Sequence, residues 1–440
     1  MSRYTLHAGD CRDVMRDYPA DHFDSIVSDP PYGLSFMGKG WDKGVPGEEF
    51  WREALRVAKP GAHLLAFGGS RTFHRLTVAI EDAGWEIRDV VCWLYGSGFP
   101  KSLDVSKAID RVNGETDRLH RFTAWMRTTG VTARQIDAVT QTNMGSHYLT
   151  AGTQPAIPTA ALWQRLRPLC GDVPAWVDAL VERIAAEREV IGTKSGNLLA
   201  VAPGQANDRG ATLLDLTAPA TADAQQWAGW GTALKPAWEP VIVARKPLVG
   251  TVAANVTRYG TGAINIDGCR VGDETGRWPA NVMHDGSDEV VAGFPADEGR
   301  FFYCAKASRT DREEGCDHLP ARTGAEAVER DDDTAGLQSP RAGAGRTADT
   351  VRNFHPTVKP TDLMRYLARL VTPPDGLLLD PFMGSGSTGK GALLEGFRFV
   401  GIDLDPAHVA IAEARCQFAV DTVDAEAAAA EAPGAQLALF

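Results

Sequence analysis

The two ends of the chain alternate between short apolar runs and amphipathic segments. Near the N-terminus, the continuous apolar run at 63–67 is typical of a strand buried on both faces of a sheet. Further strands are expected at 23–27, which a proline pair ends, and at 89–95, which is mostly apolar. Between them, 48–58 and 72–83 carry the spacing of amphipathic helices. Strands that alternate with helices in this way predict an α/β fold with a mainly parallel sheet.

The same alternation returns near the C-terminus. Helices are expected at 361–370, 389–394 and 407–418, and strands at 377–379 and 397–402. A further strand is expected at 239–244. The two ends of the chain therefore resemble the two parts of one α/β domain.

The middle of the chain has a different texture. Residues 115–190 contain helix-like segments, 193–230 look like a loop, and 251–349 are rich in Gly, Asp and Arg with weak periodicity. The alanine-rich tail from Asp421 is expected to be flexible. We therefore divide the chain into α/β parts, a helical insertion with a loop, a weakly periodic region and a tail. The α/β parts are 1–112, 231–250 and 350–420. The helical insertion with its loop is 113–230, the weakly periodic region is 251–349, and the tail is 421–440.

Composition limits the possible partners. The 440 residues are 44% hydrophobic and carry a net charge of −12, which counts mildly against nucleic acid but leaves room for a local basic surface. No apolar run approaches the roughly 20 residues of a membrane span, so we expect no membrane partner. Seven cysteines without a Cys-x-x-Cys pair indicate reduced thiols and a cytoplasmic protein. Cys316 and His318 lack a second ligand pair, so no metal is expected.

A glycine-rich turn follows the strand expected at 377–379. It reads Asp380-Pro381-Phe382-Met383-Gly384-Ser385-Gly386, and Asp403 ends the next expected strand. Glycines allow a ligand to approach the backbone, and an acid at a strand end accepts hydrogen bonds from ribose hydroxyls. The segment 384–390 nearly matches a phosphate-binding loop, but Gly391 stands where Ser or Thr would bind magnesium. A tight turn without a ligand is the other alternative.

A second turn, Asp29-Pro30-Pro31-Tyr32, follows the strand expected at 23–27. The prolines fix the backbone, so the Asp29 carboxylate and the Pro30 carbonyl can accept both protons of one NH2 group. Two such acceptors favour a nitrogen that becomes tetrahedral and positive as it attacks. Tyr32 offers a face on which a base can stack. The alternative is a proline turn whose Asp caps the following segment.

Together these motifs resemble the DNA amino-methyltransferases, specifically the permuted (beta) group, in which the catalytic motif precedes the cofactor motif. The segments His355-Pro356-Thr357-Val358-Lys359-Pro360 and Gly9-Asp10-Cys11 also match that family, and 96–102 and 235–240 look like a subgroup common among phages and their hosts. The resemblance implies catalytic roles for Asp29, Pro30, Pro31 and Tyr32. It implies cofactor-binding roles for Asp10, Cys11, His355, Thr357, Lys359, Asp380, Pro381, Phe382, Gly384, Gly386, Ser387, Asp403 and Leu404.

The resemblance also implies a fold and a reaction. The fold is the class I S-adenosylmethionine-dependent methyltransferase fold, a Rossmann-like seven-stranded sheet, here with a helical insertion and a DNA target-recognition region. The cofactor is S-adenosyl-L-methionine, and the substrate is a base flipped out of double-stranded DNA in a bacterial nucleoid or a phage-infected cell. Adenine N6 is favoured over cytosine N4 because Ser is commoner than Asp at position 29 in the cytosine enzymes. Methylation of a cytosine ring carbon is disfavoured, since no Pro-Cys pair occurs.

Recognition of the DNA sequence is expected in 251–349. Its candidate contacts are Arg258, Tyr259, Arg270, Arg277, Lys306 and Arg309, although solvated surface charge is an equal alternative for each. Residues 132–149 resemble a helix-turn-helix, in which Asn143, Ser146 and His147 would lie on the face that reads DNA. The alternative for this segment is a structural or protein-contact role. A homodimer and a non-catalytic DNA-binding protein that keeps the fold are further alternatives.

Overall fold

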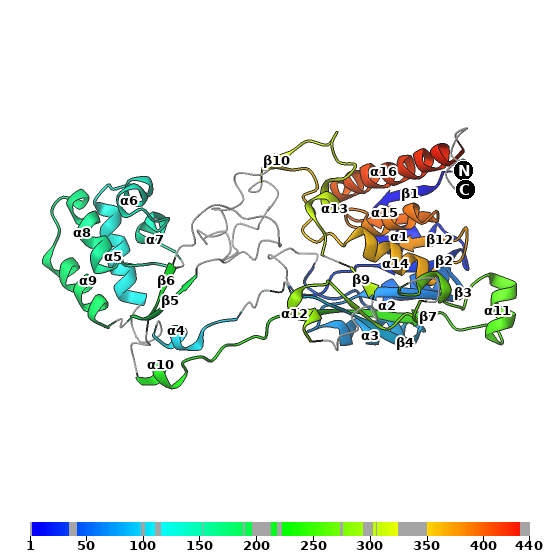
Figure 1. Ribbon diagram of the computed structural model, residues 1–440, viewed down its shortest axis with the longest axis horizontal. Coiled ribbons are helices and arrows are strands. Elements are labelled where there is room, and N and C mark those ends of the chain that lie inside the picture. Colours follow the sequence, from blue (N-terminus) through cyan, green and yellow to red (C-terminus); the bar gives the residue numbers. More distant parts are fainter. Residues whose placement is uncertain are drawn as a thin grey trace. The chain divides into compact units, whose positions relative to one another are not determined.

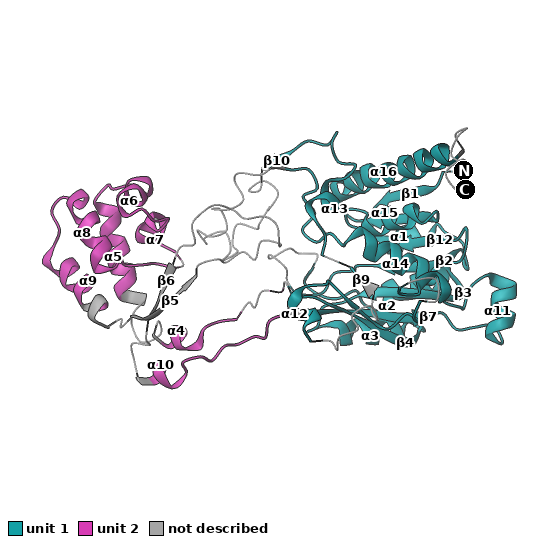
Figure 2. Cartoon of the chain, viewed as in Figure 1, with its two compact units in different colours: residues 1–96, 237–331, 346–440 teal, residues 97–236, 332–345 magenta. Residues whose placement is uncertain are grey.

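The structure is a computed structural model that describes residues 2–34, 42–96, 98, 102–110, 116–152, 154–187, 190–195, 213–217, 222–272, 276–293, 302–304, 306–323 and 350–431. The chain divides into two compact units, coloured separately in Figure 2. Unit 1 takes residues 1–96, 237–331 and 346–440, and unit 2 takes 97–236 and 332–345.

Unit 1 is built on a sheet that has nine strands in the described residues, in the order β1-β13-β12-β2-β3-β7-β4-β8-β9 (Figure 1). Strand β7 runs antiparallel to β3 and β4, and the other neighbours in the sheet pair in parallel. The strands are β1 (Tyr4–Ala8), β2 (Phe23–Ser28), β3 (Ala58–Phe67), β4 (Glu86–Leu94), β7 (Trp238–Arg245), β8 (Val282–His284), β9 (Phe302–Tyr303), β12 (Leu377–Asp380) and β13 (Arg398–Asp403).

The two ends of the chain meet in the middle of this sheet. Leu378 of β12 pairs with Ser25 of β2, so residues about 350 positions apart become neighbours. On its other side β2 pairs with β3, where Ile26 lies opposite Leu64. The prediction that both ends form one α/β domain with a mainly parallel sheet is confirmed.

Helices cover both faces of the sheet, as a parallel sheet requires. Successive side chains of a strand point to opposite faces. Ile26 therefore belongs to one apolar cluster, with Trp51 of α2, while the adjacent Val27 belongs to the other, with Leu363 of α14. The helices of unit 1 are α1 (Cys11–Arg16), α2 (Glu48–Val57), α3 (Phe73–Asp82), α11 (Val252–Tyr259), α12 (Asp288–Val291), α13 (Arg309–Glu313), α14 (Thr361–Val371), α15 (Ser387–Leu394) and α16 (Pro406–Glu431).

Unit 2 has a hydrophobic core of its own. Phe122, Ile136, Trp163 and Val177 come from four helices and pack in one cluster. The elements of this unit are α4 (Val105–Asp110), α5 (Thr116–Thr128), α6 (Ala133–Thr140), α7 (Gly145–Leu149), α8 (Ala160–Leu166), η4 (Arg167–Cys170), α9 (Ala175–Glu187), β5 (Val190–Ser195), β6 (Leu213–Thr217) and α10 (Ala222–Gln226).

The expected helix-turn-helix is present in part. Helix α6 begins with a capping box at Thr132, and α7 follows after a short turn. Asn143 and Ser146 are exposed, but His147 is buried and its Nδ1 lies 3.1 Å from the carbonyl oxygen of Gln154. His147 therefore does not lie on a reading face, contrary to the prediction.

Other expectations also need correction. Residues 193–230 were expected to form a loop, yet β5 pairs antiparallel with β6 and α10 follows. Helix α16 runs on to Glu431, past Asp421, because alanine is the strongest helix former and the helix meets neither Gly nor Pro until Pro433. In the described part of the chain, no helix has the length and hydropathy that a bilayer crossing requires.

Candidate active site

Four acidic residues meet at one edge of the sheet. Asp29 follows β2, Asp380 ends β12, Asp403 ends β13, and Asp10 comes two residues after β1. These four strands are parallel neighbours, so their carboxyl ends lie at the same edge. The Gly9 amide donates to the Asp403 carbonyl at 2.9 Å. The catalytic and cofactor motifs predicted from the sequence are thus brought together.

The proline turn holds Asp29 and Tyr32 in contact with each other. The Tyr32 hydroxyl donates to Asp29 Oδ1 at 2.8 Å, and Thr72 Oγ1 donates to the Tyr32 carbonyl at 2.6 Å. Burial is the largest cause that raises the pKa of Tyr32, followed by the charges of Asp29 and Glu239, so the phenol keeps its proton. Both oxygens of Asp29 accept from side chains, which disfavours the alternative that Asp29 caps the following segment.

Lys359, which the resemblance assigns to the cofactor pocket, contacts the Asp29 carboxylate. Its Nζ is 2.7 Å from Asp29 Oδ2, 3.0 Å from the Tyr32 hydroxyl and 3.4 Å from Glu239 Oε2. Burial would lower the pKa of Lys359, but Asp29 and Glu239 outweigh it and raise that pKa, so the ammonium form persists. A cofactor-binding role for Lys359 stays a prediction, to which the structure adds these contacts with Asp29, Tyr32 and Glu239.

Glu239 was missed by the sequence reasoning as a site residue. It is the second residue of β7, whose antiparallel direction puts its start at the same edge as Asp29. Tyr32 also donates to Glu239 Oε2, at 3.3 Å. The available signal was an acid at the start of a predicted strand, but the direction of that strand depends on the sheet topology.

Asp380 joins the two motifs rather than facing outward. It is 1% exposed and accepts from Ser28 Oγ at 2.6 Å and from the Phe382 amide at 3.0 Å. Burial raises the pKa of Asp380 to about 7, against hydrogen bonds from Ser28 and Thr388 that lower it. This carboxylate therefore fixes the end of β2 to the start of the glycine turn.

The glycine turn is held from two sides. Gly384 (φ +52°) donates its amide to Asp403 Oδ2 at 3.0 Å, and a Cβ at this position would lie 2.7 Å from His355 Nε2. The buried Arg415 of α16 donates to the Ser385 carbonyl at 2.7 Å and to Ser387 Oγ at 3.2 Å. Only glycine fits the close approach at position 384.

Two histidines adjoin Asp403. His408 Nδ1 lies 3.2 Å from Asp403 Oδ1, and the rings of His408 and His355 are 4.6 Å apart. Burial would raise the pKa of Asp403, but hydrogen bonds from His408 and the Asp405 amide lower it. Burial is the largest cause that lowers the pKa of His355 to about 4, so this ring is neutral at pH 7. Asp403 is thus an ionised acceptor at the strand end.

The other predicted cofactor residues differ in their surroundings. Asp10 caps α1 and forms an ion pair with Arg12 at 2.6 Å. Leu404 is 71% exposed, beside Asp403. Cys11 is buried, and the Phe382 ring lies between 5 and 6 Å from the rings of Phe50 and Trp51. Pro381 is buried and Thr357 is exposed, with its carbonyl 2.9 Å from His355 Nδ1.

Arg258 and Tyr259 do not reach this edge. They end α11, whose Asn255 donates to the Pro60 carbonyl near the start of β3. That start pairs with the beginning of β2, whereas Asp29 follows its end. Strand direction therefore places them toward the edge of the sheet opposite Asp29, and their role as DNA contacts stays a prediction.

Three further candidate DNA contacts, Arg270, Arg277 and Lys306, can also be placed by strand direction. Arg270 and Arg277 precede β8, so they lie toward the beginning of that strand. Lys306 instead lies 3.5 Å from the centre of the Tyr95 ring, which follows the end of β4. Of these three, Lys306 is the one that the structure brings to the carboxyl edge.

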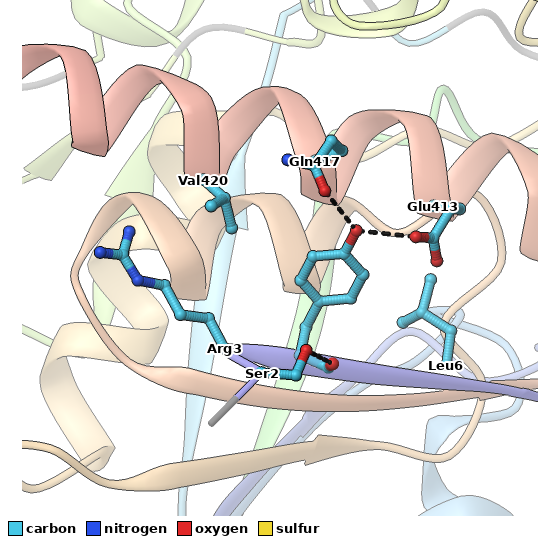
Figure 3. Close-up of a pocket in the computed structure, with 7 residues that line it drawn as sticks. Ser2, Arg3, Leu6, Glu413, Gln417 and Val420 are labelled. Carbon is cyan, nitrogen blue, oxygen red and sulfur yellow. Dashed lines mark hydrogen bonds between the residues drawn. The ribbon is translucent and has the colours of Figure 1, made fainter.

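A hollow of about 410 Å³ lies elsewhere on unit 1, between β1 and α16 (Figure 3). In it the Tyr4 hydroxyl donates to Glu413 Oε1 at 2.7 Å and contacts Gln417. Tyr4 pairs with Phe399 at the start of β13, opposite the Asp403 end. This hollow is therefore separate from the cluster of acids.

The sheet, with its one reversed strand and its acids at the carboxyl edge, defines the class I S-adenosylmethionine-dependent methyltransferase fold, as expected. The expected number of strands was seven, whereas the described sheet has nine, because β8 and β9 extend it beyond β4. Residues 23–414 match the N6/N4 methyltransferase family, described as DNA methylase. The chain belongs to this family, whose methyl donor is S-adenosylmethionine.

Individual relatives are similar over shorter stretches. The type II methyltransferase M.Cfr9I of Citrobacter freundii is 35% identical over 92 residues, which are 21% of this chain and 31% of that protein. M2.DpnII of Streptococcus pneumoniae is 40% identical over 68 residues, 16% of this chain and 25% of that protein. The matches thus span about a third or less of these relatives.

Solved structures resemble the chain weakly. PvuII DNA methyltransferase (cytosine-N4-specific) is 12% identical with a TM-score of 0.39, covering 94% of this chain and 86% of that one. M1.HpyAVI in complex with SAM is 11% identical with a TM-score of 0.35, covering 94% and 98%. The fold assignment depends on the strand order and the family match instead.

Proposed function

We propose that this chain transfers a methyl group from S-adenosylmethionine to N6 of an adenine flipped out of double-stranded DNA. The observation that carries the proposal is the meeting of Asp29 and Asp403 at one edge of the sheet, on strands separated only by β12. This arrangement supports a role for Asp29 as the acceptor for an amine and a role for Asp403 as the acceptor for ribose hydroxyls. DNA is the substrate class of the family to which the chain belongs.

The residues present fit the cofactor. Gly384 and Gly386 have positive φ angles and bring the backbone of the turn close to the Asp403 end of β13. Asp403 is ionised, and Leu404 beside it is an exposed apolar side chain. S-adenosylmethionine supplies an activated methyl group. Asp10, His355 and the turn from Asp380 to Ser387 complete the proposed pocket.

Catalysis would then depend on positioning. The base stacks on Tyr32, and its amine donates to Asp29 and to the Pro30 carbonyl, with Pro31 fixing the turn. The nitrogen would form the new N–C bond directly as the methyl–sulfur bond of S-adenosylmethionine breaks, and the electron pair of that bond would stay on sulfur in the neutral thioether that leaves. The proton that the nitrogen gives up would go to the Asp29 carboxylate and then to solvent. Asp29 is 18% exposed, so this proton has a route out.

Asp29 favours adenine N6, and cytosine N4 is the alternative, since serine is commoner at this position in the cytosine enzymes. A non-catalytic DNA-binding protein is disfavoured, because the contacts among Asp29, Tyr32 and Lys359 are complete. We also propose that the chain belongs to the permuted group and the phage-associated subgroup. Lys306, rather than α11, would face DNA in the region 251–349.

Replacement of Asp29 tests this function. In Asp29→Asn one charged acceptor becomes a neutral amide, so single-turnover methyl transfer should fall about 10²–10³-fold, as for loss of a charge-stabilising group. Binding of S-adenosylmethionine, measured by calorimetry, should change little. Methylation-sensitive sequencing of DNA from a host that expresses the parent chain reports the base, the atom and the site together. Unmodified host DNA, or full transfer by Asp29→Asn, would refute the proposal.

A further inference from the structure

Lys359 directs its ammonium group at three oxygens. The acceptors are Asp29 Oδ2 at 2.7 Å, the Tyr32 hydroxyl at 3.0 Å and Glu239 Oε2 at 3.4 Å. An ammonium group has three donors and no acceptor, so these contacts use its full capacity. The Lys359 side chain is only 9% exposed. Its position is therefore set by the catalytic turn and β7.

The cluster holds two carboxylates and one ammonium group. Without the ammonium, Asp29 and Glu239 would repel each other across the Tyr32 hydroxyl that both accept from. Like charges this close disfavour double ionisation, and an opposite charge restores it. Other titratable groups that interact with the cluster include Asp380, His355, Lys306 and Tyr95.

We propose that Lys359, anchored by Glu239, is a positioning residue that holds the Asp29 carboxylate toward the target amine and offsets the neighbouring charge of Glu239. This inference rests on the proposed function and deepens it, since it assigns a residue of the cofactor-side motif to the catalytic carboxylate. A protonated Asp29 would present a donor to the amine instead of an acceptor. The rate of methyl transfer would then depend on the charge of Lys359.

The first test compares Lys359→Met with Lys359→Arg in single-turnover reactions at saturating S-adenosylmethionine. In Lys359→Met the acidic limb of the rate–pH profile should move to higher pH by about one to three units, which is the pKa change expected when a neighbouring opposite charge is lost. Lys359→Arg keeps the charge and should keep the limb near its parent position. The dissociation constant for the cofactor should stay within about threefold in both, as expected when no direct contact is lost.

A matched control lies at the other end of β7. Lys246 forms an ion pair with Asp21 at 2.7 Å and also contacts the Ala58 carbonyl. Lys246→Met removes a comparable pair from the opposite edge of the sheet. Its rate and its acidic limb should match those of the parent chain.

Glu239→Gln distinguishes an electrostatic role from a merely structural one. This change removes a negative charge beside Asp29 and leaves Lys359 to pair with Asp29 alone. The acidic limb should therefore stay in place or move to lower pH, opposite to Lys359→Met. If both variants move the limb upward by the same amount, or if Lys359→Met weakens cofactor binding instead, the inference is wrong.

A measurement without turnover separates this inference from the proposed function. With the ammonium removed, a carboxylate of the folded protein binds a proton at higher pH than in the unfolded chain. The urea midpoint of Lys359→Met should therefore fall as the pH rises from 5 to 8, relative to Lys359→Arg. If the urea midpoints of Lys359→Met and Lys359→Arg have the same dependence on pH, the inference is wrong even if the parent chain is active. A parent chain that methylates no DNA refutes the function, while the midpoints still decide the role of the charge.

Discussion

Gly386 allows a quantitative prediction about the cofactor turn. It precedes α15 with φ +76°, and an added Cβ would lie 2.8 Å from Ala412 Cβ and 2.9 Å from Ala412 Cα. Ala412 is fully buried in α16. Gly386→Ala therefore combines a left-handed backbone, which costs about 1–2 kcal/mol for a residue with a Cβ, with overpacking, which costs about 1–3 kcal/mol. The free energy of unfolding should fall by about 2–5 kcal/mol.

Gly396 provides the matched control for this clash. Its φ is +82°, and a Cβ there would meet nothing within 4 Å. Gly396→Ala should therefore show the backbone cost alone, about 1–2 kcal/mol. The difference between the two variants isolates the contact with Ala412.

The assay is pulse proteolysis in urea, with peptides of unit 1 followed by mass spectrometry so that unit 2 does not contribute. Gly386→Ala should also weaken binding of S-adenosylmethionine, because its backbone must shift away from α16, and Gly396→Ala should not. Equal loss of stability in the two variants would show that α16 shifts to accommodate the added Cβ without a measurable cost. The reasoning from the Ala412 contact would then be refuted.

Two further predictions concern titration and the cofactor. Burial, and then the charge of Arg245, lowers the pKa of His63 to about 4, so the unfolded chain binds the proton first as the pH falls from 6.5. Unfolding free energy should drop by about 3 kcal/mol between pH 7 and pH 4 through this residue, and His63→Gln should remove that part of the slope in urea titrations. Asp403→Asn should weaken cofactor binding about tenfold or more in calorimetry, while Asp405→Asn, on the more exposed neighbour, should not. If His63→Gln leaves the slope of unfolding free energy against pH unchanged, the role of His63 in that slope is wrong. If Asp403→Asn and Asp405→Asn lose the same affinity for S-adenosylmethionine, the assignment of Asp403 to the cofactor is wrong.

The sequence predicted the strands that are buried on both faces. Leu64 and Leu65 of β3 are fully buried, and they stand in a continuous apolar run that can be read directly from the sequence. Strands β8 and β9 were missed because two or three residues carry no measurable periodicity. Sequence patterns therefore identified the centre of the sheet and failed at its edge.

Site residues could be predicted where their motif directly follows a strand that the sequence also predicts. Asp29 and Asp403 each stand at a strand end, and parallel pairing brings such ends together. The contact between Lys359 and Asp29 was not predictable, because it joins residues 330 positions apart and depends on the order of strands in the sheet. The place of Arg258 in the fold was not predictable for a related reason, since charge along a sequence does not indicate which edge of the sheet a helix covers.

The strand order also explains how unit 1 accommodates a long insertion. The chain leaves unit 1 after Gly96 and returns at Ala237. Just inside these points, Leu94 pairs with Trp238, and the Tyr95 amide donates to the Ala237 carbonyl at 2.9 Å. An antiparallel pair can be joined by a connection of any length, because the entropy of closing a loop grows only slowly with its length. The described residues between 97 and 236 therefore include a hydrophobic core of their own, while β4 and β7 keep their pairing and with it the place of Glu239 beside Asp29 and Lys359.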